Sequence, residues 1–321
     1  IGGVSLSGYG LLFAFIASVC WGFSPILQKK ALKNMGLLEL NAARGIGILL
    51  VLLAFLPALS FFNLSFLGLP SFDMPSFNLE ELRIDFNLCL LLAFVALVNN
   101  MVGDLLLFIA IRDIGVSLAS PISSAYPLLV TLISWVWFDE KLTSVILLGT
   151  FAVVAGLVLL NLRANPKESK ASPRGIAAAI FAAVCWAIGL SLNKYLLLHG
   201  VTSFAVTFWR GFFFGLMSIA CWIGFLLYRP ARLKGEMERL KKIPISDWIC
   251  GSSAGVIALV IGGWVFTSSL ALIPISVATP IASSSPLIAA LAATTFMRER
   301  LRPLQWVGIV FVVFGAVVVS L

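Results

Sequence analysis

Three polar residues within one long apolar stretch offer the clearest chemistry in this sequence. Asn99, Asn100 and Asp104 lie in a run long enough to cross a lipid bilayer. Asn100 and Asp104 share a helix face because they are four residues apart. A charge there costs about 2.5–3.5 kcal/mol on insertion scales unless it meets a wet cavity or a partner. Asp104 is therefore a candidate amine anchor or proton carrier, with Asn99 or Asn100 orienting the ligand; the alternative is a purely interhelical hydrogen-bonding role.

Two short segments repeat one pattern of prolines and hydroxyl groups. Ser120–Pro127 reads SPISSAYP, and Thr279–Pro286 reads TPIASSSP, 159 residues later. Proline removes a backbone donor and clashes with the preceding turn, so each segment should be a kinked or unwound helix. Broken helices at matching places in two halves of a membrane chain are typical of a transport site. The predicted hinges are Pro121, Pro127, Pro280 and Pro286, and the candidate substrate-binding hydroxyls are those of Ser123, Ser124, Tyr126, Ser284 and Ser285. Repair of the disrupted backbone hydrogen bonds is the alternative role for these hydroxyls.

Two tryptophans and two arginines are also duplicated inside apolar stretches. Trp21 and Trp186 each follow a cysteine, and Arg44 and Arg210 each precede a glycine. The tryptophans are candidates for stacking on a cationic group, with core packing as the alternative. For the arginines we expect an architectural role, as snorkelling side chains or caps of neighbouring helices; anion binding is the rival interpretation.

The composition excludes a soluble protein. Of the 321 residues, 60% are hydrophobic and 11% are charged, and the mean hydropathy is +1.06, whereas soluble domains carry about 25% charged residues. The net charge of +8 does not predict a nucleic-acid partner, because the basic residues lie in short loops between apolar runs. No phosphate-binding loop occurs, and His199 and the five cysteines lack metal-ligand spacing. We therefore expect no enzyme, no cofactor and no metal site.

The apolar runs predict an all-α integral membrane protein with ten transmembrane helices. A polar linker, 165–173, separates a first five-helix repeat (1–164) from a second (174–321), which together form one membrane domain. We predict helices over Tyr9–Gln28, Leu38–Phe61, Phe86–Ile111, Val116–Trp137, Ser144–Leu162, Gly175–Leu198, Thr202–Leu227, Asp247–Leu270, Ile275–Met297 and Pro303–Leu321. Asn63–Asp85 should lie at the membrane surface, and Tyr228–Ser246 should be a polar helical hairpin or loop.

The two halves match each other in spacing. Pro127, Glu140, Gly149 and Gly156 recur without a gap as Pro286, Glu299, Gly308 and Gly315. Because each half has five helices, the second crosses the membrane in the opposite direction, as an inverted repeat. The polar cluster is not duplicated: Asn99, Asn100 and Asp104 correspond to Ala258, Leu259 and Gly263. We expect the glycines to serve close helix packing or a dimer interface, and the glutamates to form surface ion pairs or helix caps.

The distribution of basic residues predicts the orientation. Of the 22 lysines and arginines, 17 lie in loops after odd-numbered helices and three in loops after even-numbered ones. The positive-inside rule then places both termini outside, most simply in the plasma membrane.

These features resemble a known family. Trp21-Gly22, Arg44 and the Pro127, Glu140-Lys141-Leu142, Gly149, Gly156 series resemble the EamA-type repeat, and Trp186, Arg210, Pro286, Glu299-Arg300-Leu301, Gly308 and Gly315 resemble a second copy. The whole chain is similar to the ten-helix drug/metabolite transporter superfamily. The resemblance implies a central cavity lined by helices 1–4 and 6–9, and export or exchange of small organic solutes.

The sequence thus predicts a secondary active or facilitative transporter of a small organic solute, such as a metabolite, amino acid, amine or drug, that works by alternating access. Its expected partners are that solute and the lipid bilayer. Coupling to protons or cations, and a monomer or a homodimer, are left open. The alternatives are translocation of a lipid-linked or amphipathic substrate, or a membrane receptor or subunit that does not transport.

Overall fold

The computed structural model describes residues 6–59, 82–161, 172–228, 230–297 and 302–321, and every regular element in these ranges is a helix. A chain within hydrocarbon must satisfy its backbone polar groups internally, and helices do so within one segment. Nine of the described helical stretches are long and apolar enough to cross a membrane, and the shorter apolar helix Ile275–Leu291 accounts for the tenth crossing. Glu299 falls outside the described residues, as do most of the predicted linker, whose last residue Pro173 begins a helix, and most of the predicted surface segment.

The first repeat contains five crossings. Its elements are α1 (Leu6–Ala31), α2 (Leu37–Leu59), a third crossing made of α3 (Phe86–Val95), the π-helix η3 (Ala96–Val102) and α4 (Gly103–Ile114), a fourth made of α5 (Val116–Ser123) and α6 (Tyr126–Phe138), and α7 (Ser144–Asn161).

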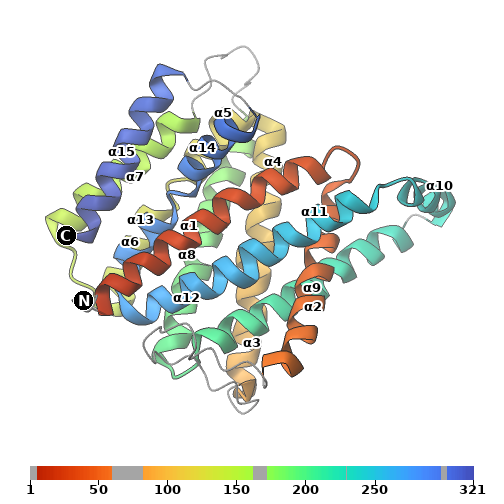
Figure 1. Cartoon of the computed structure of the whole chain (residues 1–321), viewed down its shortest axis with the longest axis horizontal. Coiled ribbons are helices and arrows are strands. Elements are labelled where there is room, and N and C mark those ends of the chain that lie inside the picture. Colours follow the sequence, from red (N-terminus) through yellow and green to blue (C-terminus); the bar gives the residue numbers. More distant parts are fainter. Residues whose placement is uncertain (1–5, 60–81, 162–171, 229, 298–301) are drawn as a thin grey trace.

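The second repeat follows the same order in the opposite direction. Its elements are α8 (Pro173–Leu198), α9 (Ser203–Tyr228), a third crossing made of α11 (Ile245–Gly255), the π-helix η5 (Val256–Ile261) and α12 (Gly262–Leu272), a fourth made of α13 (Ile275–Ala282) and α14 (Ser285–Met297), and α15 (Pro303–Ser320). The start of α1 and the end of α15 lie at the same end of the molecule (Figure 1).

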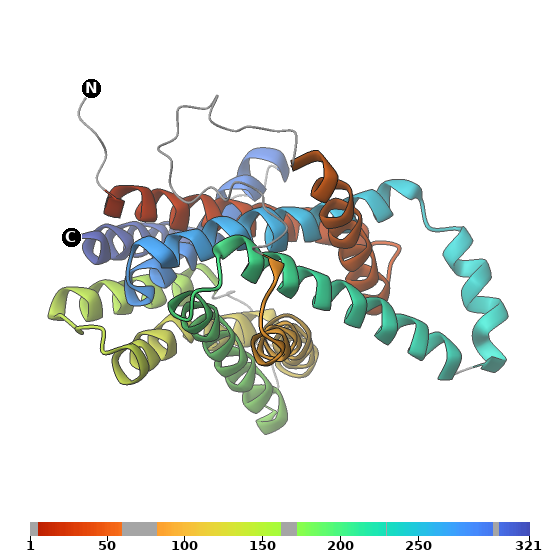
Figure 2. The ribbon, with the colours of Figure 1, turned by 90° about the horizontal axis from the view of Figure 1, so that it is seen from below.

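One polar helix lies outside the bundle. α10 (Pro230–Lys241) joins α9 to α11 and projects beyond the membrane-crossing helices (Figure 2). The sequence leaves a hairpin or a loop open for this segment, and the structure has a single helix there.

Contacts between the repeats hold the bundle together. α1 packs against α11, α12, α13 and α14, α2 against α9 and α11, and α4 against α8. At the edge, α7 and α15 lie side by side (Figure 1). Their duplicated glycines face each other: a Cβ on Gly156 would lie 2.6 Å from the Gly308 carbonyl oxygen, and one on Gly315 would lie 2.5 Å from that of Gly149. The sequence predicts either close helix packing or a dimer interface for these glycines. The contacts in the described residues are those of close packing within the chain.

The two proline segments interrupt their helices. α5 ends at Ser123 and α6 begins at Tyr126, while α13 ends at Ala282 and α14 begins at Ser285. The break therefore falls between the two prolines of each segment, where the sequence pattern predicts it. The role of these breaks as hinges remains a prediction.

The π-helices are a feature that the sequence pattern does not reveal. η3 and η5 occupy matching places in the third crossing of each repeat, and η3 contains Asn99 and Asn100. Single-turn π-helices within α-helices occur frequently at functional sites, because they redirect side chains and free backbone groups.

Candidate functional site

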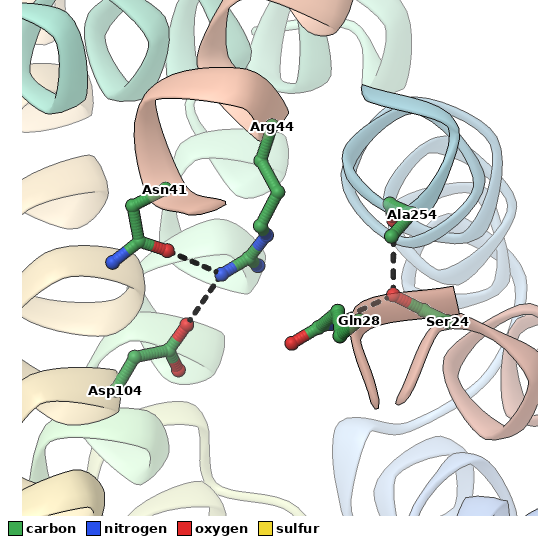
Figure 3. Close-up of polar contacts among 6 residues, drawn as sticks. All are labelled: Ser24, Gln28, Asn41, Arg44, Asp104 and Ala254. Atoms are coloured by element: carbon green, nitrogen blue, oxygen red, sulfur yellow. Dashed lines mark hydrogen bonds and ion pairs between the residues drawn. The ribbon is translucent and has the colours of Figure 1, made fainter. Parts of the chain in front are cut away.

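An ion pair between α2 and α4 lies inside the bundle. Arg44 Nη1 lies 3.2 Å from Asp104 Oδ2 and donates a 2.9 Å hydrogen bond to Asn41 Oδ1 (Figure 3). The Arg44 guanidinium carbon is 5.3 Å from the centre of the Phe214 ring on α9, which suits a cation–π contact. The expectation that Arg44 snorkels to the head groups or caps a helix is wrong, because its side chain is buried and paired with an acid sixty residues away.

The two partners of this ion pair differ in accessibility. The Asp104 side chain is 22% exposed, whereas that of Arg44 is 6% exposed. The arginine is thus buried, and its Nε atom donates no hydrogen bond to a described residue, whereas the carboxylate keeps one accessible side. Trp186 of α8 also lies close to the Asp104 carboxylate. Its indole lies against Gly103, where a side chain would leave no room for the ring.

The two asparagines of η3 are buried beside this pair. Asn99 packs against Gly189 of α8 so closely that a Cβ added to this glycine would lie 2.5 Å from the Cβ of Asn99. The Asn100 Oδ1 atom is buried and accepts no hydrogen bond from the described residues. A buried amide oxygen without a donor is costly, and such a group is commonly satisfied by water or a ligand.

A matching half-site lies where α1 of the first repeat meets α12 of the second, which also packs against α9. Trp21 Nε1 donates a 2.9 Å hydrogen bond to the carbonyl oxygen of Ala258 in η5, and its ring centre is 5.0 Å from that of Phe266. The guanidinium of Arg210 lies against Gly263 and is buried, with 4% of the residue exposed. Like Arg44, Arg210 does not snorkel.

The broken helices contribute Tyr126 to the first half-site. The Tyr126 and Trp186 rings meet edge to face, 5.9 Å apart, and the Tyr126 hydroxyl lies close to Ser283 at the other break. Ser18 of α1 and Ser284 are also hydrogen-bonded, at 2.9 Å. The two interrupted helices are thus joined to each other and to α1 near the centre of the bundle.

Several of the predicted hydroxyls bond to their own backbone. The hydroxyl groups of Ser123, Ser283 and Ser284 donate to the carbonyl oxygens of Ser120, Pro280 and Ile281, at 3.1, 2.8 and 2.6 Å. These bonds fit the repair role that the sequence leaves open. Ser124 and Ser285 are half-buried at the breaks.

Glu140 joins the two repeats at one end of the bundle, where Lys194 also binds a helix end. The Glu140 carboxylate accepts hydrogen bonds from the backbone N–H groups of Ile275 (2.8 Å) and Ser276 (3.0 Å), which start α13. Lys194 of α8 donates to the carbonyl oxygen of Leu270, near the end of α12. An anion at a helix start and a cation at a helix end are both favoured by the helix dipole. Glu140 is thus a helix cap, but it caps a helix of the other repeat.

Other polar residues at the centre were not singled out from the sequence. Gln28 donates to Ser24 Oγ, which itself donates to the Ala254 carbonyl oxygen, and both residues lie on α1 (Figure 3). Asn193 is fully buried, and neither its amide nitrogen nor its oxygen bonds to a described residue. The internal duplication could have indicated these two residues, because Gln28 directly precedes Lys29 and Asn193 directly precedes the matching lysine, Lys194.

The fold is that of a polytopic membrane protein built from two copies of one repeat, and the comparisons place it among membrane transporters. The EamA-like transporter family model matches residues 8–162 and again 173–321, and the chain belongs to this family. It is similar to an uncharacterized transporter of Archaeoglobus fulgidus, with 26% identity over 187 residues, and it spans about three fifths of that relative's length. A crystal structure aligns over 96% of this chain and 95% of its own at a TM-score of 0.71 and 16% identity, which shows a shared fold.

Proposed function

We propose that the protein is a secondary active or facilitative transporter that moves a small organic solute across the membrane by alternating access. The observation that carries this proposal is the placement of buried charges between two inverted repeats. Arg44 and Asp104 come from the first repeat and contact Phe214 and Trp186 of the second, while Arg210 of the second repeat is buried on α9, one helical turn before Phe214. Charges held at such a depth mark solute or ion pathways.

The interrupted helices supply the moving parts in this proposal. Each break brings small hydroxyl residues and non-helical backbone to the bundle centre, and the Ser18–Ser284 hydrogen bond and the Tyr126–Ser283 contact join elements of opposite repeats. Rocking of one repeat against the other would break such bonds on one side and form their equivalents on the other. The site residues proposed from the sequence stay candidates for contacting the solute: Asn99, Asn100, Asp104, Trp21, Trp186, Ser123, Ser124, Tyr126, Ser284 and Ser285.

Enzyme chemistry is disfavoured by the residues around the site. The buried charged groups there are two guanidinium groups and one carboxylate. Among the described residues, no three His, Cys, Asp or Glu side chains are grouped so that they could hold a metal. A guanidinium group is a poor acid or base in proteins. Binding and translocation of a solute can use these groups in their charged forms, without proton transfer.

A panel of solutes in proteoliposomes tests the proposal. Purified protein is reconstituted, and uptake of radiolabelled amino acids, amines, carboxylic acids, sugars and nucleotides is compared with that of protein-free vesicles. We expect saturable uptake of at least one class. Saturable binding of a solute without uptake would favour the receptor or subunit alternative, and transfer of a lipid between leaflets without solute uptake would favour the lipid-linked one.

The proposed orientation places both termini outside the cell and α10 in the cytoplasm. Single cysteines at His199 and Lys242, which are exposed beyond the ends of α8 and α10, are introduced into a cysteine-free chain. An impermeant thiol reagent on intact cells should label His199→Cys and spare Lys242→Cys until the cells are opened. The reverse pattern would overturn the orientation and leave the fold unaffected.

A further inference from the structure

The two repeats place the same pair of residue types at the centre of the bundle. Trp186 of the second repeat packs against Gly103 of the first, with its Nε1 2.7 Å from where a Cβ on that glycine would lie. Trp21 of the first repeat packs in the same way against Gly262 of the second, with its Cδ1 3.1 Å from the corresponding position. The glycines are 159 residues apart, like the proline segments. The centre therefore contains two half-sites related by the internal duplication.

The half-sites differ at the next residue. In the first, Asp104 follows Gly103 and forms an ion pair with Arg44. In the second, Gly263 occupies the matching position, and the Nη2 atom of Arg210 lies where its side chain would begin. The arginine is duplicated, but its acid is not.

The two tryptophans have different partners in the two half-sites. Trp186 lies close to the Asp104 carboxylate. Trp21 meets no carboxylate in its half-site, and its indole N–H donates to the backbone carbonyl oxygen of Ala258. At these matching positions, the first half-site thus has a negatively charged residue, Asp104. The second half-site has an uncharged one, Gly263.

Arg210 is left with a buried and uncompensated charge. The residue is 4% exposed, and its guanidinium forms no ion pair or hydrogen bond with a described residue. Arg44 covers the ring of Phe214, one helical turn from Arg210 on α9, so the Arg44–Asp104 pair and Arg210 approach one region. Together the three groups carry one net positive charge. Burying a charge is costly unless it is paired, which favours an anionic partner from outside the chain.

We propose that Arg210 binds the carboxylate of the transported solute, at the position that Asp104 occupies in the other half-site. The substrate class is a small carboxylic acid, with or without an amino group. A guanidinium is suited to this ligand because it offers two parallel N–H donors to the two carboxylate oxygens. The inference rests on the proposed transport function and names the substrate class of that site.

Binding of acids is compared with binding of their amides. The probes are L-alanine, L-leucine, L-phenylalanine and L-lactate, each beside its primary amide, and the readout is the thermal unfolding of the purified full chain in detergent. We expect at least one acid to bind at least tenfold more tightly than its amide. The test variant is Gly263→Asp, which supplies the missing acid, and the steric control is Gly263→Ala. A Cβ at this position is too close only to the flexible end of Arg210, and the nearest backbone atom, the Ala258 carbonyl oxygen, is 3.8 Å away.

Gly263→Asp should unfold at or above the temperature of the wild type and bind the acid at least tenfold more weakly, because its carboxylate competes for Arg210. Gly263→Ala should show a much smaller loss, and Arg210→Gln should lose the preference for acid over amide. Equal binding of every acid and its amide by the wild type, or wild-type acid binding by Gly263→Asp, would overturn the inference. Uptake of an amine or a sugar without any preference for acids would do so too, while the transport function would stand.

Discussion

Asp104→Asn should lower the rate of solute transport at least tenfold, with the protein still inserted in the membrane. The substitution keeps the shape of the side chain and removes its charge. Arg44 would then be a buried cation without its ion-pair partner, and Trp186 would face an amide in place of a carboxylate. Removing one partner of a buried pair typically costs 3–5 kcal/mol, so we also expect a lower unfolding temperature.

The control for this change lies on the same helix. Asp113 of α4 pairs with Arg112 and Arg174, whose side chains are 65% and 72% exposed. Asp113→Asn should transport nearly as the wild type does, because Arg112 and Arg174 stay solvated when Asp113 loses its charge, whereas Arg44 does not. Asp104→Glu should recover part of the rate, since it keeps the charge. Wild-type rates for Asp104→Asn together with a lower unfolding temperature would assign Asp104 a purely structural role.

Gly156→Leu should produce the largest loss of stability. A Cβ on Gly156 would lie 2.6 Å from the Gly308 carbonyl oxygen and 2.7 Å from the Val312 nitrogen. Both are backbone atoms of α15 and cannot move aside as a side chain can. Overpacking a well-packed interior costs about 1–3 kcal/mol, and separating two helices along a glycine contact should reach or exceed the upper end.

Gly224→Leu is the matched control for this effect. Gly224 is also in a membrane-crossing helix, α9, and a Cβ there has no heavy atom within 4 Å. Thermal unfolding of both variants in the same detergent compares the two positions directly. A similar decrease for both would mean that leucine lowers stability irrespective of the α7–α15 contact.

The fold could be predicted from the sequence because its determinants are local. Apolar runs mark the crossings, the doubled prolines mark the interruptions at Ser124 and Ser284, and the spacing from Pro127 to Gly156 marks the duplication. The sequence predicts that the glycines of α7 and α15 pack closely. It does not determine whether they pack within this chain or against a second copy of it. The structure places them against each other.

The site was predicted less completely because its determinants are pairwise and distant. Asp104 was singled out as the central charge, but its pairing with Arg44 joins residues sixty positions apart, and no local pattern reports it. The π-helices η3 and η5 depend on how the third crossings pack, and the local sequence gave no sign of them. The difference between Asp104 and Gly263 was visible in the sequence. The sequence alone did not indicate that this difference leaves Arg210 without an acid, because that conclusion depends on the contact between Arg210 and Gly263 in the structure.

The measurement that tests the central claim most directly is solute counterflow. Proteoliposomes are loaded with an unlabelled solute that the protein takes up, and entry of the same solute in labelled form is followed from outside. Alternating access predicts that internal solute accelerates the entry and produces a transient accumulation, because loaded sites reorient in both directions. Entry that stays linear and is unaffected by internal solute would contradict transport through a single site exposed to one side at a time.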